Sequence, residues 1–140
     1  MTGKFHRVLF VWMTLFGILL MTGGCAQVKE ETGEKKDIDF TVVRENEIPE
    51  DLLADIEENK KEGFHTVFRD TEYLYIAVGY GEQQTGGYSV AVEKLYALEE
   101  NIHLRTKLIG PKKGEQVHKA SSYPYLVLKL ELREGKVVFE

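Results

Sequence analysis

The histidines and serines of this 140-residue chain are the side chains that could carry out acid–base or nucleophilic chemistry. His118 lies close to Ser121 and Ser122, and a neighbouring histidine can activate a serine hydroxyl as a nucleophile. That chemistry also needs an acid that orients the imidazole, which three residues of one loop do not supply. His65 and His103 stand apart at polar strand positions, and no two histidines have the H-x-x-x-H spacing of a metal pair. We therefore expect no enzyme, no metal site and no cofactor.

Cys25 is the single cysteine, and it follows a hydrophobic leader. The apolar run Val8–Met21 follows a positively charged start, and its 14 residues suit a signal peptide but are too few to span a bilayer. Gly23 and Gly24 before the cysteine resemble the processing site of bacterial lipoproteins, in which the chain is cut before the cysteine and the sulfur receives a diacylglyceryl group. This pattern predicts a signal peptide over residues 1–24 and lipidation of Cys25. The alternatives are an ordinary secretory signal or an uncleaved anchor.

Either way, the predicted location is the outer face of the bacterial cytoplasmic membrane, with the membrane itself as a partner through the lipid. Loss of residues 1–24 removes two of the 18 basic residues and none of the 23 acidic ones, so the net charge falls from −5 to −7. A domain this acidic is not expected to bind nucleic acid. Residues 26–37 contain one bulky apolar side chain, Val28, and are predicted to form a disordered tether after Cys25.

One amphipathic helix is predicted in the segment IPEDLLADIEENKKEG, residues 48–63. Its apolar residues recur with the 3.6-residue period of a helix, Pro49 suits the first turn, and Gly63 can close the end. Because the apolar stripe is narrow, the helix should lie on a sheet with its other face in water.

The remaining segments alternate polar and apolar residues with the period of two that is typical of strands, and turn-like residues separate them. These segments are residues 38–42, 64–68, 73–78, 88–98, 101–109, 125–132 and 136–139. A parallel sheet would need more crossover helices than the chain contains. The prediction is a mainly β (α+β) fold, a small antiparallel sheet or sandwich of six or seven strands with one N-terminal helix. It forms a single β-rich domain over residues 38–140.

Two loops have an unusual composition. Residues 79–88, GYGEQQTGGY, contain four glycines, and residues 110–125, GPKKGEQVHKASSYPY, are longer than a simple connection requires. Glycines allow tight turns, and tyrosines are enriched at recognition surfaces. The sequence therefore predicts a binding loop, with the residues Gln84, Thr85, Gly86, Gly87, Tyr88, Tyr123 and Tyr125. A plain hairpin turn and strand aromatics at the core edge remain the alternatives.

Residues 73–130 resemble the C-terminal domain of PrcB-type protease-complex subunits, which occurs in bacterial exported lipoproteins. The resemblance rests on the Thr-Gly-Gly-Tyr turn at 85–88, the strand that follows it, and the Tyr-Pro-Tyr element at 123–125. It implies a non-catalytic subunit that stabilises or matures a secreted protease.

The function expected from the sequence is therefore that of a membrane-anchored lipoprotein that binds and stabilises an exported protein, such as a protease. Direct inhibition of a protease is the alternative, because residues 84–88 loosely resemble a Thr-Gly loop of chagasin-type cysteine-protease inhibitors. The later Arg-Pro-Trp loop of those inhibitors has no counterpart here. A surface that binds a small ligand, with Tyr88 and Tyr125 side by side, is a further alternative.

Overall fold

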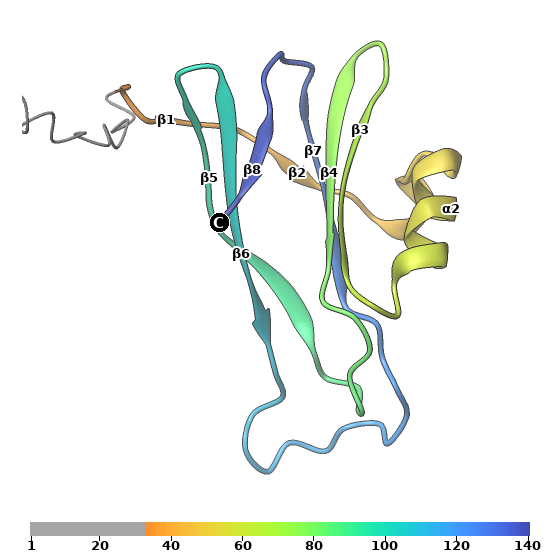
Figure 1. The fold of residues 1–140 in the computed structure, drawn as a ribbon. Helices are drawn as coiled ribbons and strands as arrows, with labels where there is room; N and C mark the ends of the chain where they lie inside the picture. Colours follow the sequence, from red (N-terminus) through yellow and green to blue (C-terminus); the bar gives the residue numbers. More distant parts are fainter. Residues whose placement is uncertain (1–32) are drawn as a thin grey trace, which may run out of the picture. The chain divides into compact units, whose positions relative to one another are not determined.

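The computed structural model describes residues 33–140. The predicted signal peptide, Cys25 and residues 26–32 of the predicted tether lie outside the described residues. The described part is mainly β, with eight strands in two four-stranded sheets and one α-helix (Figure 1). This confirms the predicted fold class, with one strand, β1, beyond the predicted segments.

The first sheet has the strand order β1-β5-β6-β8. Its strands are β1 (Lys36–Asp37), β5 (Ser89–Leu98), β6 (Asn101–Ile109) and β8 (Val137–Phe139). The second sheet has the order β2-β7-β4-β3. Its strands are β2 (Thr41–Val42), β7 (Tyr125–Glu131), β4 (Tyr73–Gly79) and β3 (Phe64–Arg69). The alternating pattern predicted the five long strands, β3 to β7, and also the short strand β8 within residues 136–139.

Two apolar clusters lie on opposite faces of the second sheet because successive strand residues point to opposite sides. One cluster fills the space between the sheets, where Leu74 and Leu128 meet Leu95 and Leu104 of the first sheet. The other lies on the far face and contains Ala77, Val127 and the helix residues Leu52 and Ile56, among others. The second sheet is thus buried on both faces, which explains the continuous apolar run in β4.

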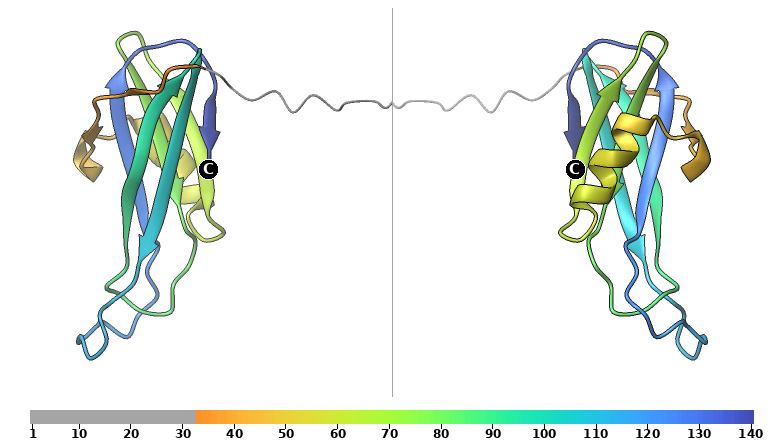
Figure 2. Two further views of the ribbon diagram at one scale, coloured as in Figure 1. Left: turned by 90° about the vertical axis from the view of Figure 1, so that its left-hand side faces the viewer. Right: turned by 90° about the vertical axis from the view of Figure 1, so that its right-hand side faces the viewer.

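The helix α2 (Glu50–Asn59) lies over the outer face of the second sheet (Figure 2). A short 3-10 helix, η1 (Glu45–Glu47), precedes it. Pro49 takes the position before the first helical residue, and Gly63 closes the following turn with a positive φ of 82°. Thr66 of β3 donates a hydrogen bond of 2.7 Å to the Asp55 carboxylate and so fixes the helix to the sheet.

The predicted strand over residues 38–42 is divided in the structure. Ile38 packs into the core between the sheets, whereas Val43 packs into the cluster under the helix. The chain must therefore cross from the first sheet to the second between these residues. In addition, the predicted tether boundary at residue 37 shifts, because Lys36 and Asp37 pair with Ala97 and Tyr96 as strand β1.

The β6–β8 pair is parallel, in contrast to the all-antiparallel expectation. β7 belongs to the second sheet and runs toward the end of the domain that contains the β5–β6 turn. At this end of the domain, residues 132–136 cross back to the first sheet. Gly135 lies against the carbonyl of Glu100 in that turn. β8 therefore starts where β6 starts and runs in the same direction.

Candidate functional site

The two glycine- and tyrosine-containing loops predicted from the sequence lie together at one end of the two-sheet domain (Figure 1). We call residues 80–88 and 110–124 the paired loops. Gln83 and Ser122 form an antiparallel bridge with backbone hydrogen bonds of 2.8 and 3.0 Å. The Gly86 amide donates to the His118 carbonyl at 2.9 Å, and the Ser122 hydroxyl donates to the Thr85 carbonyl at 2.7 Å. These bonds join segments more than thirty residues apart into one surface.

The first loop is also held to the end of the helix. The Glu82 amide donates to the Lys61 carbonyl at 3.0 Å. Gly81 has a positive φ of 75°, and a Cβ atom there would lie 3.1 Å from that same carbonyl. Glycine is needed at this position because the backbone of the loop approaches the backbone after the helix so closely.

Gly87 forms the corner that the Gly-Gly pair was predicted to form. Its φ is +86°, and a Cβ atom there would lie 2.8 Å from Cγ1 of Val117 and 3.1 Å from Cβ of Pro111. The second loop thus covers one side of this glycine, while Gly87 and Gln84 remain exposed to solvent. The turn therefore serves the packing of the paired loops and also presents part of their surface.

The three tyrosines of the predicted site have different neighbours. The Tyr88 ring lies beside Gly110, where an added Cβ would be 3.2 Å from Cε1 of the ring. Tyr123 lies under the ammonium group of Lys60, which is 5.5 Å from the ring centroid. Tyr125 packs against the cluster under the helix. Each ring is partly buried. Tyr88 lies beside Gly110 whereas Tyr125 packs at the cluster under the helix, so the two rings have different neighbours.

Charged side chains near helix α2 shift the pKa values of Tyr125 and Lys60. Burial raises the pKa of the Tyr125 phenol, and the carboxylates of Glu45 and Glu57 raise it further. The hydrogen bond from Lys60 to Glu57 raises the pKa of the Lys60 ammonium group. Both groups therefore keep their protons at neutral pH, and Lys60 presents a fixed positive charge next to Tyr123.

Two of the residues that could form a nucleophilic centre, His118 and Ser122, take part in hydrogen bonds between the paired loops. The Ser122 hydroxyl is a hydrogen-bond donor to Thr85, and His118 contributes its backbone carbonyl. Within residues 33–140, no group of three or more His, Cys, Asp or Glu side chains is placed to hold a metal ion. The same range contains no helix of the length and hydrophobicity that a bilayer crossing requires.

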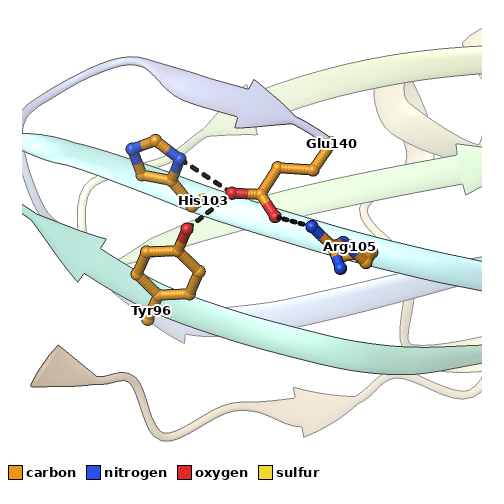
Figure 3. A network of polar contacts seen from close by, with 4 residues as sticks. All are labelled: Tyr96, His103, Arg105 and Glu140. Atoms are coloured by element: carbon orange, nitrogen blue, oxygen red, sulfur yellow. Dashed lines mark hydrogen bonds and ion pairs between the residues drawn. The ribbon is translucent and has the colours of Figure 1, made fainter. Parts of the chain in front are cut away.

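Sequence reasoning missed a polar cluster on the outer face of the first sheet (Figure 3). One oxygen of the Glu140 carboxylate accepts hydrogen bonds from the Tyr96 hydroxyl at 2.5 Å and from Nδ1 of His103 at 3.2 Å, and the other oxygen accepts from Arg105 at 2.9 Å. The rings of Tyr96 and His103 stack with their centroids 5.0 Å apart. We call these four residues the Glu140 cluster.

The contacts within the Glu140 cluster stabilise the ionised form of the Glu140 carboxyl group. The hydrogen bond from Tyr96 lowers the pKa of the Glu140 carboxyl, and the contacts with His103 and Arg105 lower it further. His103 is only 5% exposed although it occupies a polar position in an alternating strand. The alternation of β6 placed His103 on the outer face, but the partner at residue 140 is 37 positions away and leaves no local signal.

Residues 74–131 match the family model described as PrcB C-terminal, in agreement with the resemblance over residues 73–130. The matched segment runs from β4 to the end of β7 and includes both paired loops. No curated protein and no solved structure matches the chain.

Proposed function

From the match of residues 74–131 to the PrcB C-terminal family, we propose that this chain is a non-catalytic adaptor that binds an exported protein through its paired loops. The observation that carries the proposal is that two loops far apart in sequence are hydrogen-bonded into one surface inside the matched segment. Such a surface holds a fixed shape before it meets a partner, which lowers the entropic cost of binding. A subunit or substrate of a secreted protease complex is the proposed partner.

The proposal includes attachment to the outer face of the cytoplasmic membrane through a lipid on Cys25. The position of the first described residues supports this role. A Cβ atom on Gly33 would lie 2.9 Å from Glu99 in the β5–β6 turn, at the end of β5 opposite the paired loops. A lipid anchor ahead of residue 33 would therefore leave the paired loops at the end of the domain away from its point of attachment.

Affinity purification of the tagged, full-length protein from membranes tests the adaptor function. We expect recovery of an exported protein whose cellular level falls when the gene is deleted. Gln84→Arg changes an exposed residue of the paired loops and should abolish the recovery. Glu134→Arg changes an exposed residue beside the opposite end and is the matched control. Equal recovery with both variants would contradict the assignment of the loops, and recovery of no exported protein would contradict the adaptor function. Incorporation of labelled palmitate, lost in Cys25→Ser, tests the lipid separately.

Direct inhibition of a protease is the second candidate, and the convergence of loops at one end of a β-sandwich favours it, since a protruding loop edge can enter an active-site cleft. Purified residues 26–140 would then slow a cysteine protease such as papain. Gly87→Asp would remove the inhibition by separating the loops, whereas Glu134→Gln would not affect it. Unchanged protease rates over a wide concentration range would contradict inhibition while leaving the adaptor function in place.

A further inference from the structure

The short strand β8 closes one side of the space between the two sheets. Phe139 packs against the core between the sheets, and its ring stacks on His65 of β3 with the centroids 4.2 Å apart. At the other end of β3, Arg69 donates a hydrogen bond of 2.9 Å to the Gly135 carbonyl. β8, an edge strand of the first sheet, therefore lies against β3, an edge strand of the second sheet, although its ladder with β6 covers only three residues.

One backbone hydrogen bond flanks this ladder at each end. The Ile102 amide donates to the Lys136 carbonyl at 2.8 Å, and the Glu140 amide donates to the Leu104 carbonyl at 2.9 Å. A strand of three residues buries little surface, and such short edge elements open locally at low free energy. The side chain of Glu140 lies directly after the strand and adds three hydrogen bonds to β5 and β6 (Figure 3).

We propose that β8 is a releasable strap whose latch is the Glu140 carboxylate, and that protonation of this carboxylate opens the strap. In the closed state the carboxylate accepts hydrogen bonds from Tyr96, His103 and Arg105. A protonated carboxyl group loses the ion pair with Arg105 and much of its strength as an acceptor. Opening removes Phe139 from the core and uncovers the edge of β6, to which an extended strand can pair.

The charges that face the latch set the direction of its pH response. Tyr96 projects from β5, His103 and Arg105 project from β6, and Lys35 lies over the Tyr96 ring. On the β3 side, His65 stacks on Phe139. The lowered pKa of Glu140 places the release at acidic rather than neutral pH.

Amide hydrogen exchange of purified residues 26–140 tests the strap. The amides of Ile102 and residue 140 are the reporters, because both are bonded between β6 and the ends of β8. The Val43 amide, which donates to the Val127 carbonyl in the other sheet, is the reference. At neutral pH, Glu140→Gln should speed exchange at both reporters about tenfold and leave Val43 unchanged. Tyr96→Phe removes one of the three bonds and should act in the same direction with a smaller effect. Glu93→Gln is the matched control because it removes an exposed ion pair with Lys107 on the same sheet without touching β8.

The acid response is measured on the same reporters. After correction for intrinsic exchange, lowering the pH to about 3, below the ordinary value of the carboxyl group, should speed exchange at Ile102 relative to Val43 in the unaltered protein, and this shift should be absent in Glu140→Gln. Unchanged exchange at Ile102 in Glu140→Gln would overturn the latch. An equal increase at Ile102 and Val43 would overturn the strap, because the domain would then open as a whole.

Discussion

Two glycines of the paired loops have nearly the same backbone conformation but different surroundings. Gly87 has a φ of +86° and lies against Val117 and Pro111, whereas Gly114 has a φ of +83° and no atom within 4 Å of an added Cβ. The pair thus separates the conformational role of a glycine from its role in close packing.

We therefore predict that Gly87→Ala is more destabilising than Gly114→Ala. Both substitutions carry the cost of a left-handed alanine, about 1–2 kcal/mol. Gly87→Ala should cost at least about 1 kcal/mol more because its methyl group enters the contact with Val117. Urea unfolding of residues 26–140 measures the difference. Equal effects would mean that the second loop does not hold its place over Gly87.

Ser122 and Ser121 form a second matched pair. Ser122→Ala removes the donor to the Thr85 carbonyl and should lower the free energy of unfolding by about 1 kcal/mol. Ser121 is exposed, and Ser121→Ala should change the free energy of unfolding by less than about 0.5 kcal/mol. Thermal unfolding of the two variants checks this. A larger effect at Ser121 would contradict the bonding described for the loops.

The Glu140 cluster shows why individual residues were the hardest part to predict from the sequence. His103 was predicted to occupy a polar strand position. Its side chain does point to the outer face of the first sheet, but it is buried there. Tyr96 reaches it from β5 and Glu140 from the position directly after β8, and the pairing of strands determines which side chains meet. The loop residues 84–88 were identified because glycine and tyrosine are typical of turns and recognition surfaces. Their hydrogen bonds to Ser122 and His118 could not be predicted, because those residues lie more than thirty positions away in the sequence.

The helix α2 contributes to stability through two buried side chains. Leu52 is 1% exposed and Ile56 is not exposed, whereas Leu53 is only partly buried. Ile56→Ala should therefore lower the free energy of unfolding by about 2–5 kcal/mol, and Leu53→Ala should have a clearly smaller effect. Urea denaturation of both variants provides the measurement. Similar losses for the two would indicate that the helix packs with a different face toward the sheet.

The elements themselves were largely predictable because their signals are local. The hairpin of β3 and β4 has strand residues on both sides of Asp70, whose carboxylate accepts hydrogen bonds from the amides of Glu72 and Tyr73. The short strands β1 and β2 were not predictable in the same way. Lys36 and Asp37 have no apolar pattern, and the alternation of residues 38–42 does not reveal that the chain changes sheets within it.

The stability of the entire domain should decrease in acid. Hydrogen bonds from Glu72 and Tyr73 lower the pKa of Asp70, and those from the Glu140 cluster lower the pKa of Glu140. The unfolded chain therefore binds more protons than the folded one, so these carboxylates stabilise the fold above their ordinary values of 3.8 and 4.5 and lose this contribution as the pH falls through the lowered values.

The measurement is the urea midpoint between about pH 6 and about pH 3. The double variant Asp70→Asn, Glu140→Gln should show a smaller decrease than the unaltered domain, and Asn can still accept the turn hydrogen bonds at position 70. Glu134→Gln, at an exposed position in the β7–β8 loop, should leave the profile unchanged. Identical profiles for all three proteins would show that other carboxylates dominate the acid response.

The position of Gly33 at the β5–β6 turn, opposite the paired loops, has a mechanical consequence. β1 leaves that end antiparallel to β5, with Lys36 opposite Ala97 and a further bond from the Ile38 amide to the Leu95 carbonyl. In the proposed adaptor, a pull between an anchor ahead of Gly33 and a partner at the paired loops would run along the strands. The β1–β5 bonds would then be sheared together instead of being peeled apart one by one, an arrangement that suits a domain under load.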